Sequence, residues 1–503
     1  MAASSQFPGK GEALIHFVFE DSWKKDKRIQ ILDKISNGNL TRKINLHNFL
    51  GRDKQVVFCE INNDYQTIFL AGLGKTKDFT LGKFKHAFAF LLRNLSHDKI
   101  NQVNVFSFKE IEKDNFQTGK NLALAFYLAN YYFTKHKNIE ARKKIHLIKE
   151  LSFISDKKNL DELNDGIRFG SLVAEGTYLV RDLVNEPASH LHPETLVNEA
   201  LKIKKESAGK ISVEILEEED CRELGMGAFL GVAQGSEKKP KFIILKYQNP
   251  AFAKATAGKP KKICLIGKSI TFDSGGLSLK PSKGMEEMKT DMAGGATVLG
   301  VFKVLAGLKS LKTIVYGILP ACENMPSGSA IHPGDIVTAI DGKTIEVINT
   351  DAEGRLTLVD GLAYAEKNLK PDLIIDIATL TGACMVALGK EITGLFGNNK
   401  KLTETFQKTA EKESEELWQL PCYHPYLKKM ESEVADIKNI SGTGYGGAIT
   451  AALFLGEFVK KTPWIHLDIA GPSLNNEEPH GVYGTGGTGW GLTTLIEYII
   501  NYN

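Results

Sequence analysis

The 503-residue chain contains only six cysteines, which are scattered without a CxxC pair, and it has no long apolar run. So few cysteines exclude a disulfide-stapled secreted scaffold and favour a reducing compartment such as the cytosol. Without a long apolar run we expect no transmembrane helix. The small, polar segment 1–11 lacks the apolar core of a Sec signal peptide. The sequence therefore predicts a cytoplasmic protein without membrane association.

A strong excess of charge of one sign is also missing. Sixty-three basic residues face 60 acidic ones, which leaves a net charge of +3. Because nucleic-acid binders usually carry a marked basic excess, we do not expect nucleic acid to be a main partner. With 42% hydrophobic and 24% charged residues, the composition is that of an ordinary globular protein. The length predicts more than one domain.

Several common catalytic signatures are absent from the sequence. It has no HExxH helix of a one-zinc protease, no GxSxG nucleophile elbow and no GxxxxGK[ST] phosphate loop. The glycine-rich run 484–489 lacks the strand and helix context of a nucleotide site. His190 and His192 form an isolated HxH pair, which is weak evidence for a metal site.

The first third of the chain alternates strand-like and helix-like segments. The strand-like segments are Leu14–Phe19, Val56–Ile61, Thr67–Leu73 and Val103–Phe108, and the helix-like ones are Leu81–Leu95 and Asn121–His136. Because this part lacks a dense cluster of His, Asp and Glu, we interpret residues 1–158 as a small α/β domain with an assembly or regulatory role. A helical pattern then predicts a linking helix over 159–187, ended by Pro187.

Residues 188–503 have a different character, since glycine becomes frequent and the strand-like segments become continuous apolar runs. These runs are Ile263–Ile266, Thr313–Leu319, Leu373–Ala378 and Ile465–Ala470, with helical stretches at Met292–Leu308, Arg355–Lys367 and Ala448–Lys460. Such alternation predicts an α/β domain with a mostly parallel mixed sheet flanked by helices. Ligands of such sheets bind just beyond the carboxyl ends of the strands.

Charged side chains gather in short, glycine-flanked segments after these runs. They are Lys268, Asp273, Lys280, Asp291, Asp351 and Glu353. Residues two apart in an extended stretch point to the same side, so Asp351 and Glu353 can reach one centre. Four carboxylates arranged in this way form a reasonable site for a hard cation. By spacing alone, they can equally be ordinary solvated carboxylates of loops.

The octapeptide Asn349–Leu356 resembles the signature of the leucyl aminopeptidase family of two-metal exopeptidases. Other segments resemble further motifs of that family in the same order: Arg181–Asn185, Lys268–Gly276, Ser278–Gly300, Glu323–Gly328, Pro333–Asp335 and Ala378–Ala383. The resemblance extends from about Arg181 to the C-terminus. Ser269 and His332 depart from the residues common in the family, but neither departure removes a ligand.

The resemblance implies a pair of divalent metals, zinc or manganese, with magnesium and cobalt as further candidates. It assigns one metal to Lys268, Asp273, Asp291 and Glu353. It assigns the other, more exchangeable metal to Asp273, Asp351 and Glu353. A lysine ligand must be neutral, which requires that nearby cations lower its pKa.

The resemblance also implies roles for residues that hold no metal. Lys280 is expected to stabilise the oxyanion of the tetrahedral intermediate. Arg355 is expected to hold a bicarbonate ion that acts as the general base, because the guanidinium itself stays protonated. The side chain of the substrate's first residue is expected to enter an apolar pocket lined by Met288, Thr379, Leu380 and Gly382.

These implications predict a metal-dependent aminopeptidase that acts on peptides with a free N-terminus and prefers leucine or other apolar residues. The resemblance also implies a homohexamer. The alternative is a DNA-binding regulator built on the same fold, because some family members act in that way. A catalytically inactive assembly protein and another two-metal hydrolase, such as a phosphatase, fit the motifs less well.

Overall fold

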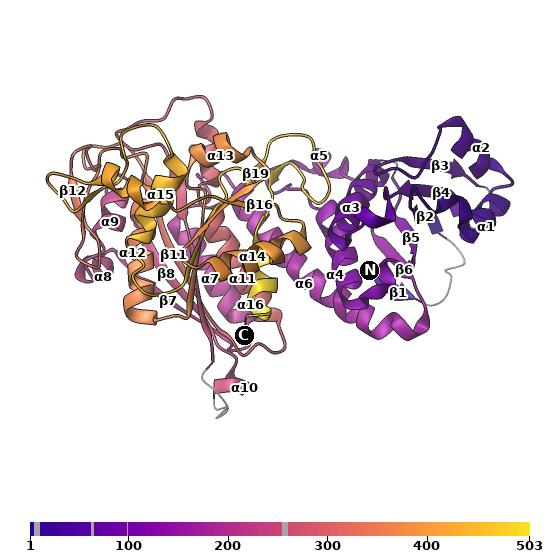
Figure 1. Cartoon of the computed structure of the whole chain (residues 1–503), viewed down its shortest axis with the longest axis horizontal. Coiled ribbons are helices and arrows are strands. Elements are labelled where there is room, and N and C mark those ends of the chain that lie inside the picture. Colours follow the sequence, from indigo (N-terminus) through magenta and orange to yellow (C-terminus); the bar gives the residue numbers. More distant parts are fainter. Residues whose placement is uncertain (5–10, 62–64, 98, 254–259, 503) are drawn as a thin grey trace. The chain divides into compact units, whose positions relative to one another are not determined.

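The computed structural model describes residues 1–4, 11–61, 65–97, 99–253 and 260–502. The chain divides into two compact units (Figure 1). The first contains Met1–Ala174 and Glu477–Gly484, and the second contains Glu175–Asn476 and Thr485–Asn503. The division falls within α6 (Leu160–Asn185), which is the helix predicted for that stretch. No pattern in the sequence predicts that Glu477–Gly484 belongs to the first unit.

The first unit is built around a six-stranded sheet. In sheet order its strands are β1 (Ala2–Ser4), β6 (Glu150–Ile154), β5 (Gln102–Phe106), β2 (Gly11–Val18), β4 (Tyr65–Gly72) and β3 (Val56–Glu60). All neighbours pair in parallel except β3 with β4. The four predicted strands are confirmed, whereas β1 and β6 were not predicted, although Leu151 and Phe153 of β6 alternate with polar residues.

The helices of the first unit are α1 (Lys27–Ile35), α2 (Asn39–Leu46), α3 (Leu81–His97), α4 (Asn115–Ala129), α5 (Ile139–Lys143) and the first half of α6. Helix α4 begins and ends about six residues earlier than predicted. The side chain of Asp114 accepts a hydrogen bond from the Gln117 amide and thereby caps its start. The side chain of Asn130 bonds to both backbone groups of Ile148, which ends the helix.

A mixed, mostly parallel sheet forms the centre of the second unit, as predicted. In sheet order its strands are β16 (Leu417–Gln419), β15 (Thr393–Gly397), β18 (Trp464–Asp468), β14 (Leu373–Ala378), β9 (Lys262–Gly267), β11 (Ile314–Asn324), β8 (Lys241–Tyr247) and β7 (Ile211–Leu216), and β10 (Ser269–Asp273) pairs with β11. The central strands β18, β14, β9 and β11 are all parallel. Every residue of β14 is buried, which explains its mostly apolar sequence, and its one charged residue, Asp376, pairs with His466.

Helices cover both faces of this sheet (Figure 1). One group contains α7 (Pro193–Glu206), α11 (Ala293–Gly307), α14 (Lys400–Glu413) and α16 (Leu492–Ile500). The other contains α8 (Glu218–Glu223), α9 (Gly227–Ala233), α12 (Gly354–Tyr364), α13 (Gly382–Leu388) and α15 (Gly447–Gly456). Both α11 and α12 contact β9 and β11, so these strands are covered from both sides.

The smaller elements of this unit are α10 (Pro250–Ala253), a three-stranded sheet of β12 (Ile336–Thr338), β13 (Thr344–Glu346) and β17 (Ile437–Lys438), and a pair formed by β19 (Leu474–Asn475) and β20 (Gly486–Gly487). Among the residues that the structure describes, no helix has the length and apolar character needed to cross a membrane.

Candidate active site

Charged and polar residues lie at the carboxyl ends of the central strands. Lys268 follows β9, Asp273 ends β10, Thr379 follows β14 and Asp468 ends β18. Because these strands are parallel to their neighbours, their carboxyl ends meet at one edge of the sheet. The structure thus places the charged segments where ligands of such sheets bind.

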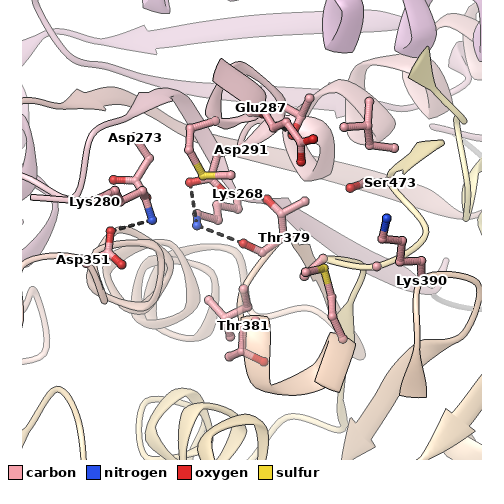
Figure 2. Close-up of a pocket in the computed structure, with 18 of the residues that line it drawn as sticks. Lys268, Asp273, Lys280, Glu287, Asp291, Asp351, Thr379, Thr381, Lys390 and Ser473 are labelled. Atoms are coloured by element: carbon pink, nitrogen blue, oxygen red, sulfur yellow. Dashed lines mark hydrogen bonds and ion pairs between the residues drawn. The ribbon is translucent and has the colours of Figure 1, made fainter. Parts of the chain in front are cut away.

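These strand ends border a cavity of about 350 Å³ (Figure 2). All the predicted site residues except Arg355 line it: Lys268, Asp273, Lys280, Met288, Asp291, Asp351, Glu353, Thr379, Leu380 and Gly382. The carboxylates of Asp273 and Asp351 lie at one end, with Lys280 between them, whereas Ser473 and Lys390 lie at the other. The cavity therefore has a strongly charged end and an end of mixed polarity.

Three carboxylates converge at the charged end. Asp273, Asp351 and Glu353 each offer an oxygen, and these oxygens all lie within 4.8 Å of one another. Asp291 is connected to them through Lys268, whose Nζ lies 2.8 Å from both Asp291 Oδ2 and Glu353 Oε1. This geometry allows the carboxylates to bind the same cation.

Lys280 forms a second bridge between the carboxylates. Its Nζ lies 2.8 Å from Asp273 Oδ2 and 2.5 Å from Asp351 Oδ1. Four carboxylates against two ammonium groups leave an excess of two negative charges in a largely buried space. Uncompensated buried charge is costly, so this end of the cavity favours additional cations.

The electrostatics of the individual groups reflect this crowding. Burial, together with repulsion from Glu353, raises the pKa of Asp273. Burial is also the main cause that raises the pKa values of Asp291 and Asp351. Burial opposes the charge of Lys268 and Lys280, but the surrounding carboxylates outweigh it and raise the pKa of both lysines.

The donor atoms fit divalent metals. Asp291 Oδ2, Asp351 Oδ1 and Glu353 Oε1 are buried, and each is ion-paired with a lysine ammonium. Carboxylate oxygens of this kind suit magnesium and manganese, and zinc accepts them as well. Three of the residues named as ligands by the family resemblance, Asp273, Asp351 and Glu353, thus lie close enough together to hold a metal ion.

Asp351 and Glu353 approach each other in a way that the sequence interpretation got wrong. Asp351 lies in a turn rather than in an extended stretch. Glu353 has helical backbone angles, φ −80° and ψ −36°, at the start of α12. The side chain of Asn349 accepts a hydrogen bond of 2.7 Å from the Asp351 amide and fixes the turn. The turn, and not strand alternation, therefore brings the two carboxylates together.

Asn324 holds the segment of Asp273 against that of Asp351. Its Nδ2 donates to Asp273 Oδ1 at 2.8 Å and to the carbonyl of Thr350 at 3.0 Å. Gly275 has a φ of +87°, and a Cβ there would lie 2.7 Å from Asp351 Oδ1. A glycine is thus needed for the turn and for the close approach of Asp351.

Arg355 lies on the first turn of α12 but is not part of the cavity wall. Its guanidinium is buried, and Nη1 donates a hydrogen bond of 2.6 Å to the carbonyl of Asn439. Burial lowers the pKa of Arg355 to about 10, so the group is still protonated at neutral pH. Its Nε is buried and donates to no described acceptor.

Comparison with known proteins identifies the family. Residues 178–496 match the catalytic domain of the cytosol aminopeptidase family, and residues 15–139 match the N-terminal domain of the same family.

The chain belongs to the cytosol aminopeptidase family.

Relatives are similar in sequence to this chain over nearly its whole length. A probable cytosol aminopeptidase of Gloeobacter violaceus is 42% identical over 509 residues, covering 98% of each chain. One of Aquifex aeolicus is 40% identical over 495 residues, covering 98% of this chain and 96% of the relative. The expected fold and family are thereby confirmed, and the chain is a hydrolase of the aminopeptidase class.

Two solved structures share the architecture of this chain. A mutant of tomato leucine aminopeptidase has a TM-score of 0.88 and 35% identity, covering 99% of this chain and 96% of that one. A bottromycin maturation enzyme in complex with Mn has a TM-score of 0.83 and 29% identity, covering 97% and 99%. The manganese in the second structure agrees with the metal dependence of the cytosol aminopeptidase family.

The sequence interpretation missed part of the cavity wall. The additional lining residues are Glu287, Thr290, Thr381, Met385, Lys390, Ala470, Gly471, Ser473, Leu474 and Asn476. Those from Ala470 onward follow β18, whose sequence predicts a buried strand but no residues of the cavity wall. The position after the carboxyl end of a parallel strand was the signal that could have identified them. The wall of the whole cavity is therefore of mixed polarity.

Gly354 offers a test of how closely Lys268 must be positioned. A Cβ at Gly354 would lie 2.4 Å from Lys268 Cε and 2.6 Å from Nζ. We expect Gly354→Ala to displace this lysine from Asp291 and to lower aminopeptidase turnover about 10²-fold, because small misplacements at reacting centres have such effects. Steady-state kinetics on the purified variant provide the measurement.

Gly361→Ala is the matched control, since it adds the same methyl group two turns later in α12. Its Cβ would meet only Ile266 Cγ2 at 3.1 Å and Ile318 Cγ2 at 3.6 Å. Turnover of this variant should stay near that of the unmodified enzyme. Equal losses in both variants would show that the effect comes from α12 in general and not from Lys268.

Proposed function

We propose that the protein is a two-metal aminopeptidase that removes leucine and other apolar residues from the N-termini of peptides. The observation that carries this proposal is the convergence of Asp273, Asp351 and Glu353 within 4.8 Å at the wall of a cavity. Family membership supports the aminopeptidase class. The leucine preference and the number of metals are the parts that this proposal adds.

The residues divide into two overlapping sets of ligands. One metal would be held by Lys268, Asp273, Asp291 and Glu353, and the other by Asp273, Asp351 and Glu353. The second set lacks a lysine and includes the more exposed Asp351, so we expect its metal to exchange more readily. Lys268 must release its proton to act as a ligand, because only the neutral amine has a lone pair.

When bound, the two cations supply Lewis acidity that polarises the scissile carbonyl, lowers the pKa of water and attracts the free α-amine of the substrate. Lys280 lies between Asp273 and Asp351, where its ammonium can donate a hydrogen bond to the developing oxyanion. Arg355 would hold bicarbonate as the general base; its Nε is buried and donates to no described acceptor, although the side chain does not line the cavity. Thr379 and Leu380 would contact the N-terminal side chain.

The proposed reaction requires a free N-terminus. We expect leucyl and methionyl peptides to be hydrolysed and their N-acetylated forms to resist, because acetylation removes the basic amine that the site attracts. The measurement is hydrolysis of paired free and acetylated peptides by protein stripped of metal and refilled with zinc, manganese, cobalt or magnesium. Equal rates on the free and acetylated members of a pair would refute amine recognition.

The panel also tests the cofactor assignment. Stripped protein should be inactive, and the stoichiometry of the most active refilled form should approach two metals per chain. Full activity with a single metal per chain would contradict the two-metal proposal, while leaving the aminopeptidase class intact.

We further propose a homohexamer in the cytoplasm. The names of the relatives support the cytoplasmic assignment. Light scattering coupled to size-exclusion chromatography measures the oligomeric mass. The alternative of a DNA-binding regulator gains no support from the relatives named above.

A further inference from the structure

Asp468 is a buried carboxylate at the end of β18 that the catalytic proposal does not use. Its exposed fraction is 0%, and it lies opposite Ala378 of β14 in the parallel register. Oδ1 accepts hydrogen bonds from the amides of Leu380 at 3.2 Å, Thr381 at 3.4 Å and Ala470 at 3.2 Å. Oδ2 accepts one from Thr381 Oγ1 at 2.7 Å. One carboxylate thus binds two segments of the chain.

Both of these segments form walls of the active-site cavity. Leu380, Thr381 and Ala470 line it, whereas Asp468 itself does not. The same hydroxyl of Thr381 accepts a hydrogen bond of 3.0 Å from the Cys384 amide and caps α13. Asp468 therefore fixes the strand-to-helix turn from behind, outside the reach of substrate.

The other end of this turn is fixed by the metal-ligand residues. The carbonyl of Thr379 accepts a hydrogen bond of 3.0 Å from Lys268 Nζ. Thr379 Oγ1 donates one of 2.7 Å to Asp291 Oδ1. The segment 379–381 is thus held between the charged end of the cavity and Asp468, and its position sets the distance between the reacting centre and the wall at Leu380.

We propose that Asp468 is a positioning residue that sets the size preference of the pocket for the N-terminal side chain. The inference rests on the proposed aminopeptidase function. A carboxylate accepts from all four donors, and bonds to an ionised acceptor are the strong ones. An amide in its place presents an NH2 group toward N–H donors, so part of the set is lost and the wall can shift. Large side chains that touch the wall then lose more than small ones.

Asp468→Asn is the test, measured with leucyl and alanyl substrates. We expect kcat/KM for the leucyl substrate to fall about tenfold or more, through a higher KM as well as a lower kcat, because the wall is misplaced. The leucyl-to-alanyl ratio of kcat/KM should fall with it. If Asp468 only stabilises the fold, fewer active molecules lower kcat equally for both substrates, and the ratio and KM stay unchanged.

Asp360→Asn is the matched control. Asp360 is also wholly buried and accepts backbone hydrogen bonds from Phe229 at 2.7 Å and Ile340 at 2.8 Å, but neither donor lines the cavity. Its replacement should leave the leucyl-to-alanyl ratio unchanged. Thr381→Ser keeps the hydroxyl that donates to Asp468 and should preserve the leucyl-to-alanyl ratio. Thr381→Val removes this hydroxyl and should lower the ratio. This pair tests the inference even if Asp468→Asn does not fold.

Metal content is determined for each variant, so that rates refer to metal-loaded chains. A ratio within about twofold of the unmodified enzyme in both Asp468→Asn and Thr381→Val would overturn the inference. So would loss of metal from Asp468→Asn, which would place its effect in the metal site. Failure of the unmodified, metal-loaded protein to release N-terminal residues would instead refute the proposed function.

Discussion

Asp273→Ala is expected to remove bound metal and aminopeptidase activity together. Asp273 is 2% exposed, converges with Asp351 and Glu353, and belongs to both proposed ligand sets. Its loss removes a carboxylate that the two metals would share, so neither set remains complete. We expect activity to fall more than about 10³-fold, the scale on which loss of an essential member of a catalytic unit acts. Metal analysis and steady-state kinetics on the same preparation measure both effects.

Asp335→Ala is a suitable control for this variant. Asp335 is exposed, and its side chain bonds to His332, outside the cavity. It should retain metal and activity. Asp273→Asn keeps the shape of the side chain but removes its charge, so it should also lose metal. Retention of full metal content by Asp273→Ala would refute the role of this residue as a shared ligand.

Lys280→Ala is expected to lose turnover without losing metal. Its ammonium lies 2.8 Å from Asp273 and 2.5 Å from Asp351, so its removal leaves these carboxylates more negative and does not weaken their attraction for cations. Loss of one oxyanion donor typically costs about 10²–10³ in turnover. Substrate affinity should change less, since the remaining wall of the cavity still holds the peptide. Metal analysis with kinetics again provides the measurement.

Lys283→Ala controls for the loss of a lysine from the same loop, because Lys283 is exposed and does not line the cavity. This variant should turn over normally. If Lys280→Ala behaved like Lys283→Ala, Lys280 would be an ordinary surface lysine. If the Lys280→Ala variant lost its metals, the role of Lys280 would be to support the metal site and not to stabilise the oxyanion.

The strand ends of the second unit were readable from the sequence for a physical reason. Strands buried on both faces must be apolar throughout, so the first charged residue marks where such a strand leaves the core. Lys268 after β9 follows this rule, whereas β14 already contains the buried Asp376. The rule gave both the parallel sheet and the edge at which the site lies.

The same rule failed where polar residues are buried inside a strand. The rule predicts Ile465–Ala470 as a continuous apolar strand, although this run contains His466 and Asp468, which are both fully buried. Asp468 is tolerated there because four donors satisfy it. Three of these donors come from Leu380 and Thr381, which are distant in sequence, so no local pattern reveals them. The surroundings of Arg355 were also not predictable from the sequence. Its guanidinium is buried against the carbonyl of Asn439, a residue distant in sequence, and does not line the cavity.

The order of strands in the sheet also affects when the enzyme can act. Strands β14 and β15 follow one another along the chain, yet β18 lies between them in the sheet. During synthesis, Lys268, Glu353 and Thr379 leave the ribosome well before Asp468. The place between β14 and β15 must remain accessible until β18 arrives, so this long-range pairing is a late step of folding. A nascent chain that stops before residue 464 carries every proposed metal ligand but lacks the strand that completes the wall. The complete cavity wall therefore cannot form until almost the whole chain has been translated.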